Sequence, residues 1–254
     1  MNAPLVHVLV INWNGREHLG ACFDSLLAQT YANVRFVLVD NASADGSADY
    51  VREHYGHDPR VEILRLDSNQ GWSGGNNRGI ERALRANADY VFLLNNDTAT
   101  DAHAIERLVT AAEADTRIGA LAPKMLMYDA PNLLNSVGLA CSLIGCCWDI
   151  GVGRLDGPHW DDVQPVLGAC GGAAFFRASV FAKAGLLPED FDIYLDDLDL
   201  SLRVWDAGYR IVTCPTARVR HKFSATMGHG KRAHRKYYLN TRNRFWLIER
   251  SFPA

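Results

Sequence analysis

The stretch YVFLLNNDT, residues 90–98, ends an apolar run with Asn95, Asn96 and Asp97. The apolar part has the composition of a buried strand, so the acid is expected at the end of that strand. An acid beside amides could hold a hard divalent cation, because such ions prefer oxygen ligands and often share them with phosphates. One carboxylate makes a weak site, so phosphate groups would have to supply further ligands. The alternative is a turn-forming acid, the commoner use of a single strand-terminal aspartate.

A second group of acids, Asp196, Asp197 and Asp199, lies in YLDDLDLSLR (194–203). The leucine spacing predicts a helix over about 197–207. Asp197 would lie in its first turn, where an acid interacts favourably with the helix dipole. Neighbouring carboxylates repel one another, and three exceed what capping needs. They therefore indicate a nearby cation or a carboxylate that acts as a general base.

A basic cluster, RVRHKFS (218–224), contains His221 and Lys222 after a stretch with strand-like composition. A histidine in such a cluster is a candidate ligand for a metal ion or a diphosphate. The other interpretation is an ordinary structural or surface histidine.

Glycines and amides dominate NQGWSGGNNRGI (69–80), which includes Asn76 and Asn77. The glycines allow a ligand to approach the backbone closely, and the amides offer hydrogen bonds without charge. The segment matches neither GxGxxG nor the P-loop, so neither dinucleotide nor Walker-type binding is supported.

These residues need elements that bring them together. Short apolar runs rich in β-branched residues predict strands at 6–12, 34–40, 61–67 and 90–95. Amphipathic patterns between the runs predict helices. This alternation indicates an α/β fold with an open, mostly parallel central sheet flanked by helices. In such sheets ligands bind beyond the carboxyl ends of the strands.

Three of these strands end in polar clusters, which begin at Asn12, Asp40 and Asn95. All three ends are expected at one edge of the sheet, which favours a shared site over three separate turns. The second half of the chain is less regular. Residues 127–165 predict a long connection, and the segment 168–177 is expected to return to the core.

The composition is that of a globular protein, with 254 residues, 48% of them hydrophobic. The net charge of -3 hides an uneven distribution, because residues 207–248 contain ten Lys or Arg and no Asp or Glu. This segment indicates an anionic ligand, an anionic membrane surface, or a solvated basic helix. The six cysteines form no CxxC pair, and the chain begins without a signal-peptide pattern. No apolar stretch is long enough to span a bilayer, so the sequence predicts a cytoplasmic protein.

Together these motifs resemble family 2 glycosyltransferases of the GT-A fold, in particular the rhamnosyltransferase-like branch of bacterial polysaccharide assembly. The resemblance extends over about residues 5–246, with VLVINWNG, FVLVDNASADGSADYV, FLLNNDT and YLDDLDLSLRVWDAGYRIV in the expected order. It implies a single GT-A domain over 1–254. A half of about 1–125 would bind the nucleotide sugar, and about 126–254 would bind the acceptor and hold the catalytic base.

The resemblance also implies roles for individual residues. Asp197 would be the catalytic base, and Asp97 with His221 would hold Mg²⁺ or Mn²⁺ on the diphosphate. The nucleotide would contact residues at the strand ends, namely Asn12, Asp40, Asn41 and Asn96. The donor sugar and diphosphate would contact Asn76, Asn77, His221 and Lys222.

Two positions depart from the family pattern. Amides precede Asp97 where many relatives have a first aspartate, and Asp196 stands where the catalytic pair usually begins with glutamate. The position of the base itself, Asp197, is intact.

The expected reaction is a single displacement at the anomeric carbon of a nucleotide-diphosphate sugar, which inverts that centre. dTDP-rhamnose is the favoured donor by resemblance, UDP-sugars stay open, and the acceptor would be a glycan or a lipid-linked glycan. An alternative is a catalytically idle partner that only binds nucleotide sugar. A nucleotidylyltransferase fits less well, because INWNGREHL is a poor match to its Gly-rich basic loop. Nucleic-acid binding is least supported.

The C-terminal segment has two candidate functions. Residues 224–238 contain glycines and basic side chains that suit a mobile loop over the donor. Tyr237, Tyr238, Phe245 and Trp246 could form an amphipathic helix on the inner face of the cell membrane. The competing interpretation is that these aromatic residues pack on the core.

Overall fold

The first half of the chain folds as the predicted alternation of strands and helices. The computed structural model describes residues 3–222 and 231–251. The elements of this half are β1 (Val6–Asn12), α1 (Arg16–Leu27), β2 (Val34–Asp40), α2 (Ser47–Tyr55), β3 (Val61–Arg65), α3 (Gly71–Arg85) and β4 (Tyr90–Asn95). The apolar β-branched runs become strands because their side chains are buried from both sides, as in parallel sheets covered by helices.

The remaining elements complete the same sheet. They are β5 (Thr98–Thr100), α4 (Ala104–Ala114), β6 (Ile118–Met127), β7 (Leu134–Ser136), β10 (Ala173–Arg177), α5 (Val180–Ala184), η2 (Glu189–Phe191), α6 (Asp196–Asp206) and β11 (Arg210–His221). Within the described residues, the strand order is β3-β2-β1-β4-β10-β6-β11-β5, and β7 pairs with β6. Strands β10, β5 and β7 run antiparallel to their neighbours, and the others run in one direction. The α/β, mostly parallel fold expected from the sequence is therefore confirmed.

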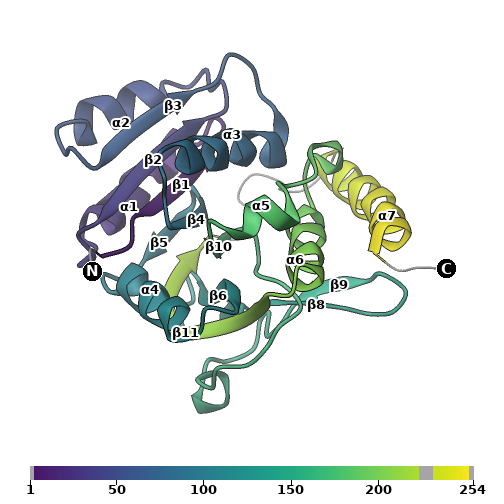
Figure 1. Ribbon diagram of the computed structural model, residues 1–254. Helices are drawn as coiled ribbons and strands as arrows, with labels where there is room; N and C mark the ends of the chain where they lie inside the picture. The colour runs from purple at the N-terminus through teal and green to yellow at the C-terminus, as the bar shows by residue number, and fades with distance from the viewer. Residues whose placement is uncertain (1–2, 223–230, 252–254) are drawn as a thin grey trace.

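Helices cover both faces of the sheet (Figure 1). Alternate residues of β1 point to opposite faces, as the period of a strand requires. Val8 and Val10 pack with residues of α1, α2 and α4, whereas Leu9 and Ile11 pack with residues of α3, α5 and α6. This arrangement leaves the carboxyl edge of the parallel strands clear of the two helical layers.

The segment 127–165, expected as a long connection, contains short elements of its own. Besides β7 it holds the hairpin of β8 (Leu139–Cys141) and β9 (Cys147–Asp149) and the 3₁₀ turn η1 (Pro158–Trp160). Strands of three residues are too short to show a period, which is why the sequence pattern misses them. The buried side chain of Lys124 holds the connection to β6, with Nζ 2.8 Å from Asp156 and 2.5 Å from Asp161.

The chain ends in the long helix α7 (Lys231–Ser251). Residues 231–238, expected as part of a mobile loop, form its first turns, and 224–230 lie outside the described residues. The buried side chain of Asn243 holds α7 in place, because its Nδ2 lies within hydrogen-bond distance of the carbonyl oxygens of Phe191, Ile193 and Tyr194. Across 3–222 and 231–251, no helix has the length and apolar character needed to traverse a lipid bilayer.

Candidate active site

The polar ends of β1, β2 and β4 meet at one edge of the sheet, as the sequence predicts. Asn12 pairs in register with Asp40, and the neighbouring Ile11 pairs with Asn95. The buried side chain of Asn12 accepts a hydrogen bond from Asn96 Nδ2 at 2.5 Å and donates one to Ser43 Oγ at 3.1 Å. The three strand ends are therefore joined by hydrogen bonds into one framework that could support a site.

Asp40 presents a buried hydrogen-bond acceptor within this framework of strand ends. Its Oδ1 accepts a hydrogen bond from the backbone N–H of Ser43 at 3.3 Å, whereas Oδ2 has no hydrogen-bond partner. Arg65 Nε lies 3.7 Å from that Oδ2 atom. A buried carboxylate oxygen without a donor is costly, so a ligand that donates a hydrogen bond fits here.

Asn41 and the two asparagines of α3 organise the adjacent loops. The Asn41 amide bonds to the segment 69–71, including Gly71 O at 2.8 Å. Asn77 is fully hydrogen-bonded within the protein, because its amide exchanges hydrogen bonds with the Leu187 backbone and donates one to Glu189. Asn76 donates to the Trp72 carbonyl, and its buried Oδ1 has no partner. Of the two, only Asn76 retains an acceptor that a ligand could use.

Asp97 lies at the turn between β4 and β5, only 6% exposed. His221, the last residue of β11, places Nε2 3.2 Å from Asp97 Oδ1. Burial raises the pKa of the Asp97 carboxyl, but the contact with His221 and the charge of His18 lower it by more, so the net pKa lies below the ordinary value. The carboxylate is therefore charged at neutral pH.

The orientation of His221 is fixed from behind by Asn135 of β7. His221 Nδ1 lies 2.7 Å from Asn135 Oδ1, which can only accept, so Nδ1 carries the proton. In the neutral imidazole Nε2 is then the lone-pair nitrogen, which lies 3.2 Å from Asp97 Oδ1 and 3.5 Å from Asn95 Nδ2. A proton or a cation between Nε2 and the carboxylate would stabilise this contact. Metal-binding histidines usually donate their second N–H in this way.

The Asp97–His221 pair fits a divalent cation as part of a larger ligand set. Two ligands at right angles around Mg²⁺, each about 2.1 Å away, lie about 3.0 Å apart, close to the observed 3.2 Å. In the part of the chain that the structure describes, no group of three or more His, Cys, Asp or Glu side chains converges on such a point. The remaining ligands would be phosphate oxygens and water.

Lys222 adds positive charge next to this pair. Its backbone N–H donates to the Asp97 carbonyl at 3.1 Å, and its Nζ lies 3.1 Å from His18 Nδ1. The Lys222 ammonium also stands over the ring of Tyr128, 5.2 Å from the centroid. The basic residue predicted from the 218–224 cluster therefore lies beside the candidate metal pair.

Gly171 and Gly172 lie between this pair and the candidate base. A Cβ on Gly171 would lie 2.6 Å from Cη2 of Trp72 and 3.4 Å from Cβ of Asp197. A Cβ on Gly172 would lie 3.4 Å from Cε1 of His221. The nearest atom to a Cβ on Gly172 would be Cε of Met125, at 2.9 Å. Asp197 and His221 therefore lie beside the same two-glycine segment, where side chains would collide with Trp72 and Met125.

Asp197 is held by two backbone donors and partly exposed. Its Oδ2 accepts from Gly171 N–H and its Oδ1 from Leu198 N–H, each at 2.9 Å. Burial raises the pKa of Asp197 to about 6; the bond from Gly171 lowers it, and the charge of Asp149 raises it. A carboxylate that titrates near neutral pH is suited to proton transfer.

The other two acids of the cluster have separate partners. Asp196 is buried and accepts a hydrogen bond from Ser73 Oγ at 2.6 Å, and burial followed by the charge of Asp197 raises its pKa. Asp199 forms an ion pair with Arg203 at 2.7 Å. The three acids therefore point in different directions from α6, and only Asp197 faces Gly171.

Asp149, at the end of β9, is a site residue that the sequence reasoning did not select. It interacts with Ser136, Cys170 and His221, its Oδ1 is buried without a partner, and burial raises its pKa. Its charge also raises the pKa of Asp197, so the two carboxylates lie near each other. The only signal in the sequence is that Asp149 is the first charge after a weakly polar stretch.

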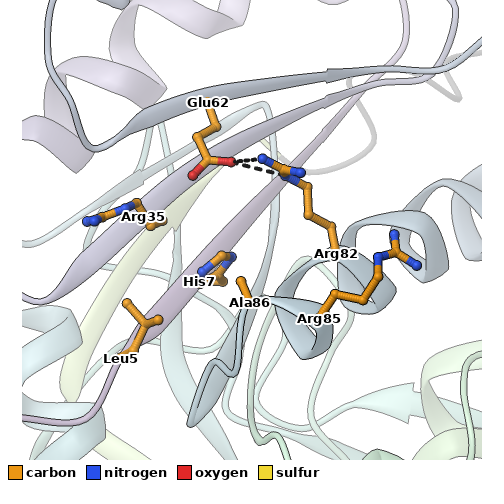
Figure 2. A pocket seen from close by; sticks show the side chains of 7 residues that line it. All are labelled: Leu5, His7, Arg35, Glu62, Arg82, Arg85 and Ala86. Atoms are coloured by element: carbon orange, nitrogen blue, oxygen red, sulfur yellow. Dashed lines mark hydrogen bonds and ion pairs between the residues drawn. The ribbon is translucent and has the colours of Figure 1, made fainter.

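One cavity among the described residues lies away from this site. It has a volume of about 350 Å³ and is lined by Leu5, His7, Arg35, Glu62, Arg82, Arg85 and Ala86 (Figure 2). His7 lies at the start of β1 and Leu5 directly precedes that strand, at the opposite end from Asn12. None of the candidate site residues lines this cavity.

Comparison with known proteins decides the family. Residues 7–184 match the profile described as "Glycosyl transferase family 2". The chain belongs to this family. The resemblance expected from the motifs is confirmed, and the fold is the GT-A fold.

Individual relatives of this family 2 member are distant. It is 26% identical over 250 residues to an N-acetylglucosaminyl-diphospho-decaprenol L-rhamnosyltransferase of Mycobacterium tuberculosis, covering 89% of this chain and 79% of the relative. It is also 26% identical over 249 residues to the low-salt glycan biosynthesis hexosyltransferase Agl10 of Haloferax volcanii, covering 94% and 73%.

Two solved structures share the fold at low identity. GalNAc-T7 with UDP, GalNAc and Mn²⁺ matches at a TM-score of 0.72 and 14% identity, over 97% of this chain and 48% of the other. A mannosyltransferase from Pyrobaculum calidifontis in complex with GDP-Man and Mn²⁺ matches at 0.67 and 19%, over 100% and 66%. This family 2 member thus spans only part of those chains.

Proposed function

We propose that this family 2 glycosyltransferase is an inverting, metal-dependent enzyme that transfers a sugar from a nucleotide diphosphate. One observation supports the proposal: Asp197 and His221, the partner of Asp97, both lie beside the segment Gly171–Gly172. A base and a diphosphate-binding pair next to one short segment suit a single displacement.

The leaving diphosphate would bind on the side of Asp97. A divalent ion held by Asp97 and His221 would stabilise the negative charge that develops on the leaving oxygens. The ammonium of Lys222, beside this pair, adds a second positive charge for the same phosphates. Mg²⁺ and Mn²⁺ both suit one carboxylate completed by phosphate oxygens.

The acceptor would bind on the side of Asp197. Its hydroxyl attacks the anomeric carbon from the face opposite the diphosphate, and Asp197 takes the proton as the new bond forms. The displacement is direct, so the anomeric configuration inverts. The raised pKa of Asp197 makes it a stronger base than an ordinary aspartate.

The nucleotide base would be a pyrimidine bound at the end of β2. The unpartnered Oδ2 of Asp40 can accept the ring N–H of uracil or thymine, within the framework of Asn12, Asn41 and Asn96. The unpartnered Oδ1 of Asn76 is available to the donor sugar. Asn77 would act indirectly, because it holds the segment at Leu187.

The donor and acceptor classes follow from the relatives. One relative transfers L-rhamnose to an N-acetylglucosaminyl-diphospho-decaprenol, a lipid-linked sugar, and another acts in glycan biosynthesis. We favour dTDP-rhamnose as donor, with UDP-sugars as the next class, and a glycan or lipid-linked glycan as acceptor. The enzyme would act at the inner face of the cell membrane.

A donor panel tests this proposal. Binding and turnover of dTDP-, UDP- and GDP-sugars are measured with Mn²⁺, with Mg²⁺ and with EDTA, and the anomeric configuration of the product is read by NMR. The proposal expects turnover of one pyrimidine donor, loss of turnover in EDTA, and inversion. A retained configuration contradicts it. Donor binding without turnover, even with lipid-linked acceptors, would favour an idle nucleotide-sugar-binding partner.

A further inference from the structure

Large apolar side chains lie exposed on two neighbouring elements, the β8–β9 hairpin and α7. At the hairpin tip, Leu143 is 90% exposed and Ile144 is 63% exposed. On α7, Tyr237, Tyr238 and Phe245 are 74%, 63% and 65% exposed. These five residues are called the outer surface below. Of the four aromatic residues singled out in the sequence, only Trp246 packs inward, against Phe191.

The two elements are in direct contact. Arg244 of α7 donates a hydrogen bond from Nε to the Ile144 carbonyl at 2.7 Å. Gly145 lies so close to α7 that a Cβ there would be 2.9 Å from Cδ1 of Ile248. The hairpin tip and the second half of α7 therefore lie side by side (Figure 1).

Basic residues accompany the outer surface. The sequence of α7 contains seven Lys or Arg and a single acid, Glu249. Arg235 and Arg250 form ion pairs with Asp192 and Asp190. Within the described residues, Arg242 stands over the ring of Tyr238 and Arg244 contacts the Ile144 carbonyl, and neither forms an ion pair. Exposed apolar and aromatic side chains combined with uncompensated positive charge fit an anionic lipid surface. Tyrosine also suits the boundary between headgroups and acyl chains, because its ring is amphipathic.

The outer surface is fixed relative to the active site. The hairpin extends from Asp149 to Ile144 at the tip, and its Leu139 packs in one cluster with Leu198, the residue after Asp197. At ~3.3 Å per residue, this distance is roughly 13–17 Å. Asn243 joins α7 to residues 191–194, directly before α6 and Asp197. A bilayer against the outer surface would therefore stand on the acceptor side of the site.

We propose that the outer surface docks this enzyme on an anionic phospholipid bilayer, with Leu143, Ile144 and Phe245 inserted among the lipids. The use of such docking rests on the proposed function, because docking would bring a lipid-linked acceptor to Asp197. The docking itself needs neither donor nor turnover, and is measured without them.

The experiment is co-sedimentation of the full chain with phosphatidylcholine vesicles, with and without phosphatidylglycerol, at low and high salt. The wild type is expected to bind the vesicles with phosphatidylglycerol and to lose affinity at high salt. Ile144→Asn and Phe245→Ser should each weaken binding about 10-fold, because each removes a side chain that would be buried in lipid. Leu155→Asn is the matched control, because Leu155 is 64% exposed but lies in the connection after β9.

Donor binding and thermal melting of the variants distinguish a lost surface from a lost fold. Equal vesicle binding by Ile144→Asn, Phe245→Ser and wild type overturns the proposal, as does absence of wild-type binding. Self-association of the wild type that Ile144→Asn abolishes, without vesicle binding, assigns the surface to a second copy and also overturns it. Because no donor is present, these results are independent of whether the transferase proposal holds.

Discussion

Nε2 of His221 lies 3.2 Å from Oδ1 of Asp97, while Nδ1 on the other side of the ring lies 2.7 Å from Asn135 Oδ1. The second contact decides the first, because an imidazole that donates through Nδ1 turns its Nε2 lone pair toward the carboxylate. Asn135 is thus a positioning residue for the candidate metal pair.

Removing the Asn135 amide should therefore weaken metal binding. We expect Asn135→Ala to lower Mn²⁺ affinity in the presence of nucleotide diphosphate by about 10- to 100-fold, as loss of such outer partners does elsewhere. Isothermal titration with Mn²⁺ measures the effect. Asn132→Ala is the control, because Asn132 is exposed in the same segment. Unchanged Mn²⁺ affinity in Asn135→Ala would remove the positioning role.

The space at Gly171 should be essential for turnover. In Gly171→Ala the new methyl would lie 2.6 Å from the Trp72 ring, which must shift or push the segment that donates to Asp197. We expect a loss of turnover of about 10- to 100-fold, with a stability cost of about 1–3 kcal/mol. Gly157→Ala is the control, because its methyl would approach no side-chain atom closer than 3.6 Å. Wild-type turnover in Gly171→Ala would show that this space is not used.

The pKa of Asp197 predicts a pH profile. Burial raises this pKa to about 6, so the base is protonated at a higher pH than an ordinary aspartate. Turnover should fall as pH decreases through about 6 and reach a plateau above it. The profile is measured at saturating donor and acceptor. A profile that stays flat down to about pH 4.5, near the ordinary range of carboxyl groups, would argue against Asp197 as the base.

The buried carboxyl of Asp196 predicts that the protein loses stability as the pH rises. Its pKa is raised by burial and by Asp197, so the folded state binds its proton more tightly than the unfolded state. The stability that the Asp196 proton contributes is therefore fully present below the pKa of the unfolded state, and it is lost as the pH rises through the pKa of the folded state. Asp196→Asn, which can still accept from Ser73, should therefore raise the melting temperature at about pH 8 more than at about pH 5. Equal shifts at both pH values would contradict the raised pKa.

The sequence is sufficient to predict the strands that end at Asn12, Asp40 and Asn95 and the helix that carries Asp197. Runs of β-branched residues such as 6–12 and 34–40 are read directly because all their side chains except the half-buried Arg35 are buried. Their polar ends, Asn12, Asp40 and Asn96, could be placed at one edge because parallel strands align their carboxyl ends. The helix with Asp197 was located within one residue.

The other half of the site depends on contacts that no local pattern encodes. Asn135 and Asp149 come from strands of three residues inside a segment without periodicity. Gly171 matters only because Trp72 and Asp197, distant in sequence, converge on it. The acids of α6 look alike in sequence, and only tertiary packing brings Ser73 to Asp196. The partner of Asp199 is local, because Arg203 lies four residues further along the same helix.

Asn243 couples α7 to the segment before the catalytic helix, where Asp192, Tyr194 and Leu195 have positive φ angles. Asn243→Ala would leave three carbonyl contacts without their donor, and we expect a loss of about 2–4 kcal/mol in the free energy of unfolding. Denaturant titration measures it. Asn240→Ala, which removes a single bond within α7, is the control and should change stability by less than about 1 kcal/mol. A similar loss of unfolding free energy in both variants would show that Asn243 does not anchor α7.

The central claim is that Asp197 removes the acceptor proton, and Asp197→Asn tests it most directly. Turnover and donor dissociation constants are compared for the wild type, Asp197→Asn and Asp206→Asn, an exposed acid on the same helix. The account predicts that Asp197→Asn binds donor like the wild type and loses about 10²- to 10⁴-fold in turnover, whereas Asp206→Asn behaves like the wild type. Turnover by Asp197→Asn at the wild-type rate, with the donor bound equally well, would contradict the account.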